Sequence, residues 1–166
     1  MPRAILIGPP GSGKSVVGKA LSKALGATFI DTDKVIEERA GRTISDIFVD
    51  DGEEFFRELE FETLVTCLKD VGAVLSLGGG APISPRAQEV LAASGAPIIF
   101  LDVSLSVAAP RVGFNRDRPL LLGNPRAQWQ ALYEKRKPIY SKLATMTIQG
   151  DGMKAHEIAT VIAKAL

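Results

Sequence analysis

The fold of this chain is decided by the stretch Gly8-Pro9-Pro10-Gly11-Ser12-Gly13-Lys14-Ser15. It fits the pattern G-x-x-x-x-G-K-[ST] and follows a short apolar run, Arg3 to Ile7. Behind it, apolar residues recur at helical spacing up to Gly26. Strand, loop and helix are the context that this phosphate-binding motif requires, and a chance turn has no need for lysine followed by serine at that offset.

Each residue type in the loop has a physical reason. Glycines let consecutive backbone N–H groups turn toward a phosphate, and the dipole of the following helix adds to the attraction. Lys14 supplies a full charge and Ser15 a hydroxyl ligand for magnesium. The loop therefore predicts a kinase that uses ATP and Mg²⁺, with Lys14 as a catalytic residue. The nucleotide contacts expected from the loop are Gly11, Ser12, Gly13, Lys14, Ser15 and Val16.

Apolar runs alternate with helical segments along the rest of the chain. Strands are expected at 28–30, 73–77, 97–101 and 145–148. Helices are expected at 14–25, at 34–69 with breaks near Gly41 and Gly52, at 86–93, after 101, at 126–136, near Tyr140, and at the end of the chain. Five strands predict one α/β domain, 1–166, with a parallel sheet covered on both faces.

Composition excludes several classes of function. With 166 residues and 46% apolar content, the chain can bury one continuous core. A net charge of +1 argues against nucleic acid or an anionic membrane as a partner. Cys67 is the only cysteine, and we expect a buried, inert thiol. No apolar run approaches the ~20 residues of a membrane span, so a cytoplasmic, monomeric protein with small-molecule partners is expected.

Polar residues gather where the expected strands end. Asp31 and Asp33 follow the second strand, and Gly78-Gly79-Gly80 follows the third, at the edge where parallel sheets bind ligands. The residues alone leave alternatives open. Asp33 or Asp31 can cap the helix that starts there, and the glycines can form a structural turn. Several other residues are individually explained by solvation or packing: Arg57, Arg111, Arg118, Arg136, His156, Trp129 and Tyr133.

Together these elements resemble the shikimate kinase family over nearly the whole chain. The matching residues are 11–15, 31–33, Phe56-Arg57 with Glu60, 75–81, Arg118-Pro119-Leu120-Leu121, and Arg136 with Pro138 and Tyr140. The resemblance implies a nucleoside-monophosphate-kinase-like fold with a core of residues 1–32, 71–112 and 137–166. It also implies a substrate-binding helical region at about 33–62 and a mobile lid at about 113–126.

The resemblance further implies a role for each site residue. Asp33 would bind the ring hydroxyls of shikimate and accept the proton of the attacking 3-hydroxyl, while Arg57 and Arg136 would hold the carboxylate. The backbone of Gly79 and Gly80 would complete the acceptor site. Asp31 would orient magnesium with Ser15, and Arg111 and Arg118 would contact ATP, Arg118 as a catalytic residue. These residue types suit shikimate chemically, because arginine forms paired hydrogen bonds to a carboxylate and an aspartate accepts hydrogen bonds and a proton from hydroxyl groups.

Two departures from the family pattern concern the nucleotide. Val16 stands where a serine or threonine is usual, and Gln149 to Met153 lacks the family's usual residues around adenine. A gluconate or nucleoside-monophosphate kinase would share the loop and lid but need other acceptor contacts. A nucleotide-dependent switch protein would instead require switch segments and a partner surface.

Overall fold

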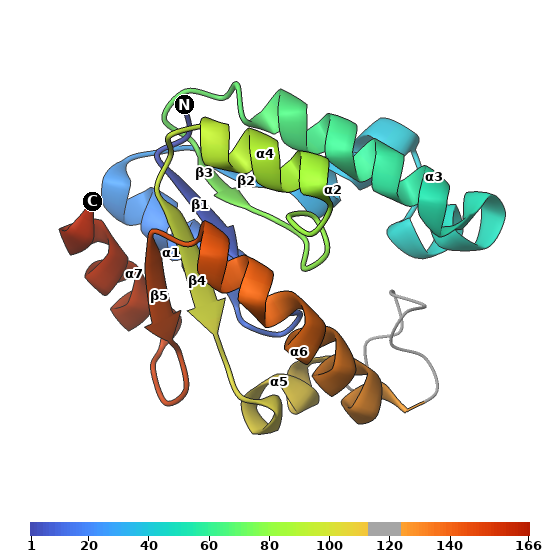
Figure 1. Ribbon diagram of the computed structural model, residues 1–166. Helices are drawn as coiled ribbons and strands as arrows, with labels where there is room; N and C mark the ends of the chain where they lie inside the picture. The colour runs from blue at the N-terminus through green and yellow to red at the C-terminus, as the bar shows by residue number, and fades with distance from the viewer. Residues whose placement is uncertain (113–123) are drawn as a thin grey trace.

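In the computed structural model, which describes residues 1–112 and 124–166, five parallel strands form one sheet with helices on both faces (Figure 1). The strand order is β2-β3-β1-β4-β5. The strands are β1 (Ala4–Ile7), β2 (Phe29–Asp31), β3 (Val74–Ser76), β4 (Ile98–Asp102) and β5 (Met146–Gln149). The predicted fold class is therefore confirmed.

The two faces of the sheet are divided by the alternation of side chains along β1. Ile5 and Ile7 point into a core shared with α3 (Ile44–Cys67), α4 (Pro85–Ala93) and α6 (Pro125–Leu143). Ala4 and Leu6 point to the opposite face, which α1 (Lys14–Leu25) and α7 (Ala155–Ala165) cover. All four side chains are completely buried. An apolar strand covered on both sides is typical of parallel sheets.

Two shorter helices lie near the carboxyl ends of the strands. Helix α2 (Thr32–Ala40) starts directly after β2, and α5 (Leu105–Val112) follows β4 and packs beside α6 (Figure 1). Because β1 and β3 are neighbours in the sheet, the phosphate loop and the glycine run that follows β3 leave the sheet side by side.

The expected breaks in the long helical stretch lie where they were predicted. Gly41 ends α2 with φ 67°, and Gly52 interrupts α3 with φ 85°. Glycine adopts this left-handed backbone without the steric cost that a Cβ imposes. Of the two aspartates for which capping was an alternative, Asp31 and not Asp33 caps α2. The Asp31 Oδ1 accepts a hydrogen bond from the backbone N–H of Asp33 at 3.0 Å.

Helix α6 also differs from expectation, because it runs unbroken from Pro125 to Leu143 instead of forming two helices. Pro138 lies inside it, where a proline removes one backbone hydrogen bond and normally ends the helix. The helix continues because Arg136 and Tyr140, on either side of the proline, are both buried, Tyr140 against Phe100 of β4 and Arg136 beside the glycine run. Tertiary packing here overrides a local preference.

Most of the expected lid lies outside the described residues, since 113–123 of its range 113–126 are not described. Arg118 belongs to that stretch. Within the described ranges, no helix has both the length and the apolar character needed to cross a membrane.

Candidate active site

The phosphate loop folds around the ammonium group of Lys14. Gly11 and Gly13 take φ values of 80° and 90°, which only glycine adopts readily. Lys14 is 9% exposed, and its Nζ donates hydrogen bonds to the carbonyl oxygens of Gly8 at 2.9 Å and Pro9 at 3.0 Å. The ammonium charge is thus held at the amino end of α1. A phosphate bound there is attracted by this charge and by the helix dipole.

A cleft of about 280 Å³ opens over this loop. Besides Lys14, its walls include Val16, Asp31 and Asp33 from the predicted site. Arg111 also lines it, and its Nη1 donates to the Gly11 carbonyl at 2.8 Å. The structure therefore brings residues from α1, β2, α2 and α5 to one edge of the sheet.

Ser15 and Asp31 form a pair suited to a hard cation. The Ser15 Oγ donates to the Asp31 Oδ2 at 2.9 Å, while the other oxygen of Asp31 caps α2. In the described part of the chain no three His, Cys, Asp or Glu side chains gather around one point. One hydroxyl and one carboxylate suit Mg²⁺, which keeps several waters and binds substrate phosphates rather than an all-protein cage.

The glycine run after β3 lets two polar side chains lie against the backbone. A Cβ added to Gly78 would come within 2.7 Å of the Asp33 Oδ1. A Cβ added to Gly80 would collide with the guanidinium of Arg57. Neither glycine has a positive φ, so the requirement at both positions is space for a neighbour rather than backbone freedom. The run also forms a turn, in which the Ala81 N–H donates to the Gly78 carbonyl at 3.0 Å, so both interpretations of the glycines hold.

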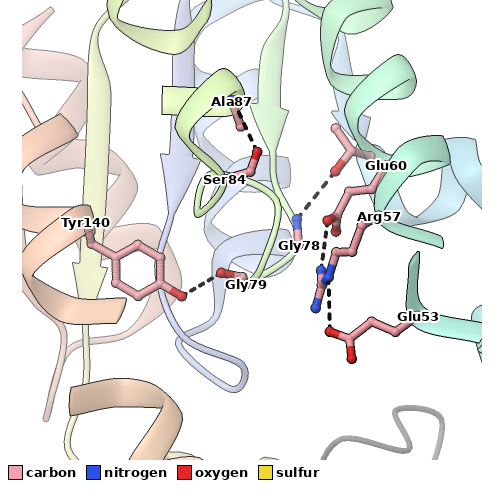
Figure 2. A network of polar contacts seen from close by, with 9 residues as sticks. Glu53, Arg57, Glu60, Gly78, Gly79, Ser84, Ala87 and Tyr140 are labelled. Carbon is pink, nitrogen blue, oxygen red and sulfur yellow. Dashed lines mark hydrogen bonds and ion pairs between the residues drawn. The ribbon is translucent and has the colours of Figure 1, made fainter. Parts of the chain in front are cut away.

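Arg57 and Arg136 flank the same run from different helices. Arg57 on α3 pairs with Glu60 at 2.8 Å and with Glu53 at 3.5 Å (Figure 2). Arg136 on α6 is 8% exposed, and its Nη1 would lie 3.5 Å from a Cβ on Gly79. Burial, with a smaller contribution from the nearby charge of Arg57, lowers the pKa of Arg136. A buried cation of this kind gains strongly from an anionic ligand.

A second cavity, of about 310 Å³, adjoins the two arginines. Gly80 and Glu60 line it together with Arg57 and Arg136. A third cavity, of about 220 Å³, lies beside the phosphate loop and is lined by Val16, Arg111, Gly150 and Met153 among others. That is the region in which the sequence departs from the family pattern around adenine.

Two contacts in the site had no signal in the sequence. The Tyr140 hydroxyl donates to the Gly79 carbonyl at 2.6 Å (Figure 2), and the Trp129 indole N–H donates to the Pro10 carbonyl at 2.8 Å. Each joins residues far apart in the chain, so neither spacing nor periodicity reveals it. Trp129 was interpreted only as a packing residue, on the basis of its four-residue spacing from Tyr133.

His156 and Cys67, for which no chemical role was expected, lie away from the cleft. His156 is exposed on α7, on the part of the chain that covers the opposite face of the sheet. Cys67 is 2% exposed, and burial raises the pKa of its thiol. Both side chains therefore lie apart from the cleft over the phosphate loop.

A phosphate loop between a strand and a helix, beside a hydroxyl–carboxylate pair and two arginines at a glycine run, defines a P-loop kinase of small anionic molecules. The family model described as Shikimate kinase matches residues 10–166. The chain is 49% identical over 165 residues to the shikimate kinase of Thermobifida fusca (strain YX), covering 99% of this chain and 95% of that one. The chain belongs to the shikimate kinase family.

Solved structures agree with this assignment. A shikimate kinase from Acinetobacter baumannii in complex with shikimate superposes with a TM-score of 0.95 at 32% identity, over 99% of this chain and 92% of that chain. A gluconokinase from Sinorhizobium meliloti reaches a TM-score of 0.56 at 18% identity, over 98% and 93%, which shows a shared fold alone. The prediction of a shikimate kinase is confirmed over its gluconate-kinase alternative.

Proposed function

We propose that this chain transfers the γ-phosphoryl group of ATP to the 3-hydroxyl of shikimate, and that the residues described above divide the work between two adjoining sites. The observation that carries the proposal is the close approach of Asp33 to Gly78, next to the cleft that holds Lys14. This approach supports the proposal, because Asp33 and the phosphate loop lie at the same edge of the sheet and a carboxylate is suited to accept a hydroxyl proton.

The acceptor site is formed by α2, α3, α6 and the glycine run. Asp33 accepts hydrogen bonds from the ring hydroxyls and takes the proton of the attacking one. Arg57 and Arg136 bind the carboxylate through charge-assisted hydrogen bonds, helped by the backbone of Gly79 and Gly80. The buried position of Arg136 supports this role, because a bound carboxylate supplies the charge that water cannot.

The nucleotide site is formed by the phosphate loop and α5. Backbone amides of 11–15 and the Lys14 ammonium bind the phosphates and stabilise the charge that spreads over the transferring oxygens. Arg111 and Met153 line the third cavity, which suits adenine in both position and size. Val16 is 62% exposed at the boundary of both nucleotide cavities and offers an apolar surface in place of a hydroxyl.

Magnesium belongs to the same proposal. Ser15 and Asp31 would hold it, the serine directly and the aspartate through its water shell, because their oxygens already converge at 2.9 Å. When bound, the ion neutralises the charge on the phosphate oxygens. The chain's own part is to fix the hydroxyl and the carboxylate at the carboxyl ends of β1 and β2.

Two further parts of the proposal come from the sequence. Arg118 acts as a catalytic arginine over the bridging phosphates, carried on a lid at about 113–126 that excludes water. The enzyme works as a cytoplasmic monomer on small molecules. Its product enters the route to chorismate and the aromatic amino acids.

One assay tests the proposal as a whole. ADP release is measured with ATP and magnesium, adding shikimate, gluconate, AMP or nothing. Shikimate-dependent release is expected. Release that depends on gluconate or AMP instead would indicate a different acceptor, and slow release without any acceptor would favour a nucleotide-dependent switch protein.

A further inference from the structure

One helix face carries side chains that reach both loops of the site. Trp129, Tyr133, Arg136 and Tyr140 are separated by four, three and four residues, so they form one stripe along α6. Trp129 contacts the phosphate loop, Tyr140 contacts the glycine run, and Arg136 lies between them. The hydrogen bond from Trp129 to the Pro10 carbonyl has no part in the function proposed above.

Trp129 is held rigidly in place. Its side chain is 1% exposed and packs with Ala108 and Val112 of α5. Its ring stacks on that of Tyr133 with centroids 5.0 Å apart and an angle of 9° between the planes. The indole N–H, its only polar group, donates to the Pro10 carbonyl at 2.8 Å. The donor therefore has a fixed position relative to α5 and α6.

The acceptor of this hydrogen bond is part of a peptide group in the phosphate loop, between two residues that line the cleft. The Pro10 carbonyl and the Gly11 N–H belong to one planar, trans peptide, so they point in opposite directions. Holding the carbonyl toward α6 aims the Gly11 N–H away from α6, and Gly11 itself lines the cleft over the loop. Since Pro9 and Pro10 have no N–H, Gly11 carries the first amide donor after Gly8.

The next peptide group is fixed from the other side. The Gly11 carbonyl accepts a hydrogen bond from Arg111 Nη1 at 2.8 Å, and a Cβ on Gly11 would lie 3.1 Å from the Ala108 carbonyl oxygen. Gly11 has φ 80° and would otherwise be free to rotate. Trp129 and Arg111 thus restrain the two peptides around one glycine.

We infer that Trp129 is a positioning residue for nucleotide binding, because its indole N–H fixes the peptide that presents the Gly11 amide to the phosphates. The inference rests on the proposed assignment of the loop to ATP. The hydrogen bond ends on the phosphate loop, where the ring of Pro10 also lies beside Gly79 of the acceptor site. We therefore expect a larger effect on nucleotide binding than on shikimate binding. A residue that only packed the helix would change stability without distinguishing the two substrates.

Trp129 is the only tryptophan in the sequence, so its indole N–H can be replaced selectively by incorporating a tryptophan analogue. A tryptophan-auxotrophic host can incorporate 3-benzothienylalanine, which keeps the shape of the ring but replaces the N–H by sulfur. Incorporation of 4-fluorotryptophan, which keeps the N–H, provides the matched control. Trp129→Phe and the control Tyr133→Phe repeat the comparison genetically, since Tyr133→Phe removes only the hydroxyl bonded to Asp102 at 2.8 Å.

In the sulfur analogue, the KM for ATP and the dissociation constant of ADP should each rise about fivefold or more, as expected when a carbonyl loses its hydrogen bond, while the KM for shikimate stays within about twofold. The fluorinated protein should resemble the wild type. Unchanged ADP affinity in the sulfur analogue, or an equal change for both substrates, would overturn the inference. If the fluorinated protein released no ADP with shikimate, the proposed function would fail, while ADP binding would still report on Trp129.

Discussion

The carboxylate of Asp33 lies directly against the Cα of Gly78, so that a methyl group at Gly78 would come within 2.7 Å of the Asp33 Oδ1. Because Asp33 is on α2 and Gly78 follows β3, this approach fixes where the proposed proton acceptor stands relative to the sheet. The backbone of Gly78 can accommodate alanine, so a substitution there tests the position of Asp33 rather than the fold.

We expect Gly78→Ala to lower kcat at least about tenfold, because it displaces the proposed general base, and general acid–base catalysis contributes typically ~10²–10⁴ in enzymes. The measurement is steady-state turnover of shikimate in a double-mutant cycle with Asp33→Ala. In the Asp33→Ala background the added methyl group has space, and it should cost nothing further. Additive losses would show that Gly78 acts independently of Asp33.

Removing either arginine of the acceptor site should weaken shikimate binding selectively. We expect Arg57→Ala and Arg136→Ala each to raise the KM for shikimate about 10- to 100-fold, the value of a lost charge-assisted hydrogen bond, with the KM for ATP within about twofold. The methyl ester of shikimate is the control. Wild type should discriminate against it strongly, and the variants only weakly.

If both variants instead discriminated against the ester as strongly as wild type, the carboxylate would bind elsewhere. Arg57 would then be a structural partner of Glu60, to which it already pairs at 2.8 Å.

Lys14→Met should leave the fold intact and reduce kcat about 100-fold or more, because a preorganised charge on the transferring oxygens is worth roughly 3–4 kcal/mol. Methionine keeps the apolar stem that is buried in the loop. Urea unfolding checks the fold, and single-turnover kinetics check the chemical step. Turnover close to wild type would contradict the assignment of the loop.

Asp31 has two roles in the structure, and two substitutions separate them. Asparagine retains the cap of α2, so Asp31→Asn should change stability by less than about 0.5 kcal/mol, whereas Asp31→Ala should cost about 1 kcal/mol. Both should raise the magnesium concentration needed for half-maximal turnover, since both remove the carboxylate beside Ser15. An unchanged magnesium requirement in both variants would remove Asp31 from the metal site.

Arg118→Ala should reduce turnover at least about 100-fold, below the ~10³–10⁵ of other catalytic arginines because Lys14 and magnesium share the charge. Arg126→Ala is the control, because Arg126 is exposed in the first turn of α6. Protease cleavage within 113–126 should also slow when nucleotide and acceptor are both bound. Normal turnover with ligand-independent cleavage would exclude the lid.

The order of strands and helices along the chain could be predicted because short apolar runs alternate with stretches of helical spacing. The phosphate loop could be predicted because all eight residues of its motif are contiguous in the sequence. Prediction failed where tertiary contacts decide. Helix α6 passes through Pro138 because buried neighbours hold it. The two alternatives for the cap of α2 are separated only by the structure, in which β2 continues to Asp31.

In the candidate site, too, residue identities could be predicted from the sequence, whereas long-range contacts could not. Asp33, Arg57 and Arg136 were identified by their place in a family pattern, but that pattern gives no reason for Gly78 and Gly80. The reason is the space that Asp33 and Arg57 occupy. The bond from Trp129 to Pro10 joins residues 119 positions apart, and no local property of either residue predicts it.

The stripe along α6 makes the number of residues between Trp129 and Tyr140 as important as their identity. One inserted residue in an α-helix would turn everything beyond it by about 100° and advance it by about 1.5 Å. Trp129 could then hold the phosphate loop only if Arg136 and Tyr140 rotated away from the glycine run. Insertions and deletions between Trp129 and Tyr140 are therefore expected to break one of the two contacts, whichever residue is inserted or removed.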